Sequence, residues 1–170
     1  ESEDMGLTIS TRSTVPILDR SIYDPAGVTG PFVIMENSLF RMWYVSGIKW
    51  VKNNGNLKSI YNIKYAQSSD GINWSRKGII SIDFISKKEL NIARPFILKN
   101  KQNYEAWFSY GEGNGYKIGY GISKNGISFD RNIENPPIIS TSKDYFENEA
   151  VCHPAVVLYK GKKFMFYNGN

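Results

Sequence analysis

The chain has 170 residues, of which 41% are hydrophobic and 22% charged, a balance typical of a globular protein rather than a disordered or fibrous one. Its 21 basic and 16 acidic residues give a net charge of +5, but the basic residues are scattered, so we expect no dedicated nucleic-acid binding. The apolar runs are far shorter than the roughly 20 residues that cross a bilayer, so no membrane span is expected.

The chain carries one cysteine, Cys152, and one histidine, His153. A lone cysteine excludes an internal disulfide, and a lone histidine cannot supply a histidine-rich metal site, so the sequence predicts neither a metal nor another cofactor. The chain starts at Glu1 with neither an initiator methionine nor a signal peptide, and we expect that processing or truncation removed what preceded it. The cellular compartment stays open.

The expected elements are short antiparallel strands, rich in aromatic and β-branched residues and separated by turn residues. A first strand is expected near residues 15–18, at the end of an earlier unit. A full unit follows, with strands A to D over residues 31–35, 39–46, 59–67 and 74–80. The second unit repeats this order, and a third contributes its strands A and B. No helix is expected.

A repeated block supports this order of strands. A proline starts each strand A, where a missing backbone donor is tolerated, and an aromatic residue follows twelve positions later. The three copies are Pro31 with Trp43, Pro95 with Trp107, and Pro154 with Phe166. The prolines recur at intervals of about 60 residues, somewhat longer than the common propeller repeats of about 40–50 residues.

A second block of fourteen residues aligns residues 61–74 with residues 116–129 without a gap. It contains Asp70-Gly71 in one copy and Asn125-Gly126 in the other, which predict type I′ hairpin turns between strands C and D. Ser68 and its equivalent in the second copy are expected to bond turn amides. The pattern resembles the Asp-box turns of sialidases, and we expect its role here to be structural.

Four-stranded antiparallel sheets repeated around an axis form a β-propeller, which needs about 4–8 blades to close. The sequence therefore predicts an all-β fold made of part of a propeller. We divide the chain into the end of a preceding blade and a connection (1–30), a full blade (31–82), a connection and full blade (83–139), and a connection with half of a third blade (140–170). Its cut blade edges are expected to favour self-association.

Several motifs resemble those of the five-bladed propellers related to glycoside hydrolase families 43 and 32, in particular a bacterial branch found beside polysaccharide-biosynthesis functions. These motifs are Gly30-Pro31-Phe-Val-Ile, Arg41-Met-Trp-Tyr44, Ser68-Ser-Asp-Gly-Ile-Asn-Trp74, Ala93-Arg94-Pro95 and Tyr167-Asn-Gly-Asn170. The resemblance implies a carbohydrate substrate, glycosidic-bond hydrolysis by carboxylates in a central funnel, and a chain that continues past Asn170.

Hairpins reverse the chain, so the D-to-A and B-to-C connections are expected to share the funnel face, whereas Glu36 and Asp70 should lie on the opposite face. The D-to-A connections supply Asp19, Asp24, Asp83, Glu89, Arg94, Asp144, Glu147, Glu149 and His153. The B-to-C loops supply Lys49, Trp50, Tyr110 and Glu112.

The resemblance implies an acid and a base, since the oxocarbenium-like transition state needs both. We assign the acid to Glu149, where burial would keep the carboxyl protonated, and the base to Asp24. In the better-known enzymes the acid often lies two residues before the strand A proline, where this chain has Thr29, Ala93 and Cys152. The predicted substrate-binding residues are Arg94, His153, Trp50, Tyr110 and Asp19.

Other roles remain open for the same residues. Asp19, Asp24 and Glu149 also suit loop capping or a solvated surface, and Arg94 and His153 also suit hydrogen bonds between blades. For the whole chain, a non-catalytic carbohydrate-binding propeller is the main alternative to a hydrolase. A glycoside phosphorylase is the third possibility and would need a basic phosphate pocket.

Overall fold

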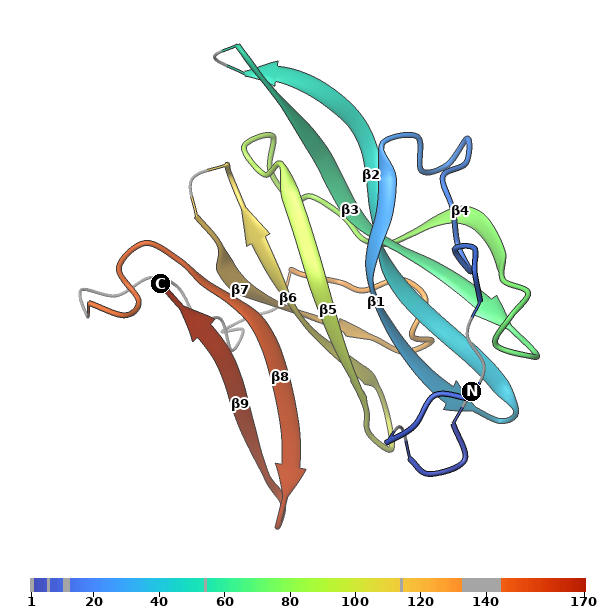
Figure 1. Cartoon of the computed structure of the whole chain (residues 1–170). Helices are drawn as coiled ribbons and strands as arrows, with labels where there is room; N and C mark the ends of the chain where they lie inside the picture. Colours follow the sequence, from blue (N-terminus) through green and yellow to red (C-terminus); the bar gives the residue numbers. More distant parts are fainter. Residues whose placement is uncertain (1, 6, 11–12, 54, 114, 133–144) are drawn as a thin grey trace.

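The computed structural model describes residues 2–5, 7–10, 13–53, 55–113, 115–132 and 145–170. It contains nine strands in two hydrogen-bonded sheets and, within those ranges, no helix (Figure 1). Every strand pair except one short bridge is antiparallel. The predicted all-β class is therefore confirmed, and the arrangement is consistent with part of a β-propeller.

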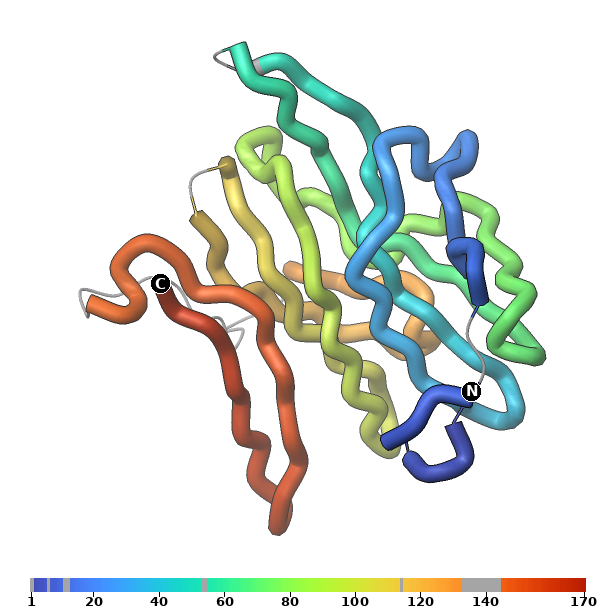
Figure 2. Tube along the Cα trace, in the orientation of Figure 1, coloured from blue at the N-terminus to red at the C-terminus, as the bar shows by residue number. Residues whose placement is uncertain are grey.

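We use the name first blade for the four strands β1 (Gly27–Glu36), β2 (Leu39–Asn53), β3 (Asn56–Ser68) and β4 (Ser75–Ile82), which pair in chain order. Strands β2 and β3 are longer than predicted and form an arm that projects from the rest of the chain (Figure 2). The sequence suggested an end near Gly47, but a bulge between Gly47 and Lys49 absorbs the irregularity and the ladder resumes beyond it.

The second blade contains β5 (Asn91–Lys99), β6 (Tyr104–Gly111) and β7 (Lys117–Ser123). Of its expected fourth strand, the described residues show a bridge between Ile122 and Asp130, and residues 133–144 lie outside the described ranges. The third unit is the hairpin of β8 (Val151–Tyr159) and β9 (Lys162–Gly169). Within the described chain β9 pairs with β8 alone, and self-association through such an edge stays a prediction.

The strand expected near residues 15–18 is not formed; these residues make bends. No described strand pairs with their backbone, and a strand needs such a partner. Leu18 instead packs its side chain against Met42, Tyr44 and Ala66 on the outer side of the first blade. Leu18 therefore covers part of a sheet face, whereas Val15 and Ile17 are largely exposed.

The core lies between neighbouring blades. Trp43, Ile63, Ile92 and Phe108, from β2, β3, β5 and β6, are fully buried in the cluster between the first two blades. A second cluster joins the second blade to the β8–β9 hairpin around Val151. Within the described residues, strand pairing between the first two blades consists of the parallel bridge from β3 to β5, with a further backbone hydrogen bond from Phe129 to Ser81. Apolar packing therefore contributes much of the contact between these blades.

The Asp70-Gly71 and Asn125-Gly126 turns differ from the predicted type I′. Only the glycines have positive φ, 74° at Gly71 and 69° at Gly126, whereas type I′ needs two such residues. Side chains stabilise the first turn. The Ser68 hydroxyl oxygen accepts a hydrogen bond from the Gly71 backbone amide at 2.9 Å. The Asp70 carboxylate accepts hydrogen bonds from the backbone amides of Ile72 and Asn73. The expected serine contacts are confirmed for both turns.

Across the ranges given above, the structure shows no helix with the length and apolar character needed to cross a membrane.

Candidate functional site

Strands β1, β5 and β8 share one backbone irregularity close to their N-terminal ends. The residue before each strand proline is left-handed, with φ of 52° at Gly30, 51° at Arg94 and 55° at His153. At the same place the pairing register shifts in all three strands. The repeat seen in the sequence is thus also a repeat of backbone geometry.

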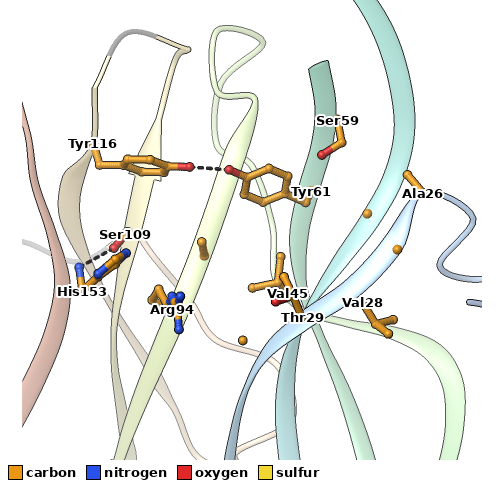
Figure 3. A pocket seen from close by; sticks show the side chains of 14 residues that line it. Ala26, Val28, Thr29, Val45, Ser59, Tyr61, Arg94, Ser109, Tyr116 and His153 are labelled. Atoms are coloured by element: carbon orange, nitrogen blue, oxygen red, sulfur yellow. Dashed lines mark hydrogen bonds between the residues drawn. The ribbon is translucent and has the colours of Figure 1, made fainter. Parts of the chain in front are cut away.

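These three segments converge, as expected. Gly30, Arg94 and His153 line one hollow together with the prolines that follow them. Beside it lies a pocket of about 450 Å³, lined by residues from β1, β2, β3, β5, β6 and β8 and from the segments before β1 and β7. Figure 3 shows Arg94 and His153 on one side of this pocket and two tyrosines on another.

The tyrosines are Tyr61 of β3 and Tyr116, the residue before β7. Their hydroxyl groups are hydrogen-bonded to each other (Figure 3). Burial raises the pKa of Tyr61, and the hydrogen bond with Tyr116 raises it further, so the hydroxyl stays protonated at neutral pH. Sequence reasoning missed both residues, although a signal was present: they are the first matched positions of the two fourteen-residue blocks.

Arg94 and His153 are both exposed to solvent in the pocket. Within the described ranges, Arg94 has no hydrogen-bond or ion-pair partner. The backbone amide of His153 donates to the Ser109 hydroxyl at 2.9 Å, which fixes the start of β8 against β6. Burial of part of the ring lowers the pKa of His153, and the positive charge of Arg94 lowers it further. His153 is therefore neutral at pH 7.

Asp24 lies outside this pocket and is fully buried. Its carboxylate accepts hydrogen bonds from Ser46 at 2.6 Å, Ser21 at 2.9 Å and Tyr44 at 3.2 Å. The Arg76 guanidinium lies 3.1 Å away. These contacts tie the segment before β1 to the first blade. The base role of Asp24 stays a prediction.

Glu149 is exposed, so the burial expected for it is wrong. Its backbone amide donates to the Asn170 side chain at 2.7 Å, and its carboxylate does not line the pocket. Asp144 lies outside the described residues. Among those that the structure describes, no aspartate or glutamate lines the pocket, and no group of three or more histidine, cysteine, aspartate or glutamate side chains could hold a metal ion.

The other carboxylates of the D-to-A connections have contacts within the protein. Glu89 forms a two-pronged ion pair with Arg131, at 2.7 and 3.0 Å. Asp83 accepts a hydrogen bond from the Asn62 amide at 3.0 Å, and Glu147 accepts one from a tyrosine hydroxyl. The Asp19 carboxylate accepts a hydrogen bond from the backbone amide of the next residue. These contacts serve local structure, and none of the four residues lines the pocket.

The two aromatic residues predicted to bind sugar also lie elsewhere. Trp50 is 57% exposed and stands on the β2–β3 arm, outside the pocket lining. Tyr110 packs beside Phe108, with the Arg131 guanidinium 5.2 Å from its ring centre. Of the five predicted substrate-binding residues, the structure brings together Arg94 and His153.

No protein-family model matches the chain. Uncharacterized protein Rv1502 of Mycobacterium tuberculosis is 28% identical over 167 residues, which cover 98% of this chain and 54% of that protein. MT1551, from another strain of the same species, matches with the same identity and coverage. The chain therefore spans about half the length of the curated relatives it matches.

Solved structures share its fold. Zg3597, a family 117 glycoside hydrolase from the marine bacterium Zobellia galactanivorans, matches with a TM-score of 0.60 and 19% identity, over 82% of this chain and 46% of its own. A further glycoside hydrolase matches with a TM-score of 0.68 and 16% identity, over 90% of this chain and 46% of its own. The family 32 β-fructofuranosidase BmSUC1 of Bombyx mori matches with a TM-score of 0.54 and 10% identity, over 81% of this chain and 28% of its own. The chain thus has the fold of part of a glycoside hydrolase.

Proposed function

We propose that this chain forms part of a five-bladed, glycosidase-like propeller and that the pocket beside Arg94 and His153 binds a carbohydrate. The observation that carries the proposal is the convergence of three equivalent strand starts on one pocket. The shared fold with glycoside hydrolases supports it. We propose hydrolysis of a glycosidic bond as the activity of the whole protein.

The lining of the pocket suits a sugar. Its volume, about 450 Å³, falls within the range of about 300–1,000 Å³ common for small-ligand sites. Thr29, Ser59, Tyr61 and Tyr116 contribute hydroxyl groups, which both donate and accept hydrogen bonds as sugar hydroxyls do. The tyrosine rings add apolar surface for the face of a sugar ring.

Hydrolysis requires two carboxyl groups at the scissile bond. Under the proposal, Glu149 is the acid and Asp24 the base, as the resemblance suggested, and replacing either should abolish turnover. The burial of Asp24 and the exposure of Glu149 favour a second candidate function, non-catalytic carbohydrate binding, because no carboxylate of the described chain lines the pocket.

Glycan-array screening and calorimetry of the whole protein test the binding proposal. Tyr116→Phe should weaken carbohydrate binding severalfold, because it removes a hydroxyl from the pocket. Tyr159→Phe is the matched control, since Tyr159 is exposed on the third unit outside the pocket. Failure to bind any carbohydrate would refute the proposal.

Aryl-glycoside turnover by the whole protein separates the functions. Loss of turnover in both Asp24→Asn and Glu149→Gln, with folding and binding retained, supports hydrolysis by these residues. Full activity in both variants contradicts the assignment. Binding without turnover on any glycoside favours the non-catalytic function, and turnover that requires inorganic phosphate favours a phosphorylase.

A further inference from the structure

The three equivalent positions before the prolines carry different residues in the same backbone conformation. Their φ values are 52° at Gly30, 51° at Arg94 and 55° at His153. Glycine adopts this conformation freely, whereas residues with a Cβ are strained in it. Gly30 therefore shows that the framework alone needs no side chain at this position.

Arg94 and His153 keep large polar side chains at a position where the backbone favours glycine. Such strain in a folded protein is typical of functional sites. Both side chains line the same pocket (Figure 3).

The charge in the pocket has one sign. Of the residues described there, Arg94 carries the one formal charge at neutral pH, because no carboxylate lines the pocket and His153 is neutral. The Arg94 guanidinium has no acceptor within the described residues, unlike Arg41, Arg76 and Arg131, which all pair with carboxylates. A neutral ligand that displaced water from Arg94 would leave its charge uncompensated.

We propose that the pocket binds an anionic sugar, whose carboxylate or phosphate group pairs with Arg94 while the ring lies toward Tyr61 and Tyr116. The inference rests on the proposed carbohydrate binding and names the substrate class. A guanidinium matches the two oxygens of a carboxylate or phosphate with parallel hydrogen bonds. His153 lines the same pocket, and its ring N–H can donate a hydrogen bond to the anion.

Calorimetry on the whole protein tests this with matched pairs of probes: neutral oligosaccharides against their uronate counterparts, and sugars against their 6-phosphates. Inorganic phosphate alone is the third arm. We expect at least tenfold tighter binding of one anionic form than of its neutral parent. The uronate and phosphate arms identify the source of the anion.

Arg94→Gly is the decisive variant, because it removes the charge and relieves the strain. It should abolish the preference for the anionic sugar while raising the thermal unfolding midpoint by a few degrees. Lys160→Gly is the matched control: Lys160 has φ of 47° in the exposed β8–β9 turn, so its replacement relieves the same strain but leaves the preference intact. Arg94→Lys should retain part of the preference.

The results distinguish this inference from the proposed function. Equal affinity for neutral and anionic sugars overturns the inference and leaves carbohydrate binding standing. No binding of any sugar overturns both. If inorganic phosphate binds as tightly as a sugar phosphate, the inference is wrong, because the pocket then recognises a free anion rather than the anionic group of a sugar. An unchanged preference in Arg94→Gly also overturns it.

Discussion

Arg41 of β2 donates a hydrogen bond to the backbone carbonyl oxygen of Asn125, 2.6 Å away in the turn after β7. The same guanidinium donates to Glu36 and to the Tyr104 hydroxyl, each at 2.7 Å, and to the Tyr65 hydroxyl at 3.0 Å. It therefore joins the first blade to the second at the end opposite the pocket. Other polar contacts between these blades include the hydrogen bonds from the Trp43 indole to the Gly126 carbonyl oxygen and from the Ser81 hydroxyl to the Ile127 carbonyl oxygen.

Arg41→Met should lower the free energy of unfolding by about 2–3 kcal/mol, because it removes a largely buried guanidinium with four hydrogen bonds, although Glu36 keeps Lys99 and Tyr104 as partners. Urea denaturation of the whole protein measures the loss. Arg41→Lys keeps the charge but not the planar set of donors, so its loss should be smaller. A loss below about 1 kcal/mol for the methionine variant would contradict the role.

Asp24→Asn should lower the free energy of unfolding by about 3–5 kcal/mol, since it removes the buried negative charge that faces Arg76 and Lys64. Ser46→Ala removes one hydrogen bond to the same carboxylate and should cost only about 1 kcal/mol. Denaturant unfolding gives both values. Activity is compared per folded molecule, so that a catalytic effect can be separated from a loss of fold. An unchanged free energy of unfolding in Asp24→Asn would argue against the structural role.

The two glycine turns provide a paired test. Gly71 and Gly126 have nearly equal φ, 74° and 69°, so alanine at either costs about 1–2 kcal/mol of backbone strain. A Cβ at Gly126 would also lie 3.0 Å from the Tyr104 ring, whereas one at Gly71 would make an ordinary 3.5 Å contact with Phe40. Gly126→Ala should therefore be the more destabilising by about 1 kcal/mol or more. Equal unfolding midpoints would refute the difference.

Glu105 of β6 should make stability depend on acid pH. Burial acts to raise the pKa of its carboxyl, but hydrogen bonds from Lys163 and Tyr120 outweigh burial and hold the pKa below its ordinary value of 4.5. A carboxyl with a lowered folded pKa stabilises the fold above its unfolded pKa, and this contribution is lost as pH falls through the lower folded value. The thermal unfolding midpoint should thus decrease as the pH is lowered below the ordinary pKa of 4.5.

Lys163→Met tests the origin of that acid dependence, because Lys163 of β9 pairs with Glu105 at 2.6 Å and connects the third unit to the second. Melting curves from pH 7 to pH 3 should show a shallower decline in this variant. An identical decline in the parent protein and the variant would exclude the pair as its cause.

Much of the fold could be predicted because the repeat places prolines and aromatic residues at matched positions. The alternation of residues within each strand then fixes which side faces the neighbouring blade. The predicted strand over residues 39–46 was shorter than β2, because the bulge after Gly47, beyond which the ladder resumes, depends on the partner strand. The turn type was missed because serine and aspartate side chains replace the backbone geometry that the dipeptide favours.

The site was less predictable because it depends on distant partners. Arg94 and His153 could be found from their common place before a proline. The burial of Asp24 could not, since its cationic partners Lys64 and Arg76 lie on other strands. Tyr61 and Tyr116 were visible as matched positions, but the reason they matter, a shared hydrogen bond at the pocket, appears only when the blades are brought together.

The left-handed residue before each proline coincides with a shift in strand pairing, whichever side chain stands there. The identity of the side chain there is therefore separable from the scaffold. Glycine, asparagine and aspartate all tolerate this conformation, so a new ligand preference can arise by exchange at one position while the sheets keep their shape. Ligand specificity in a protein built this way can evolve faster than its architecture.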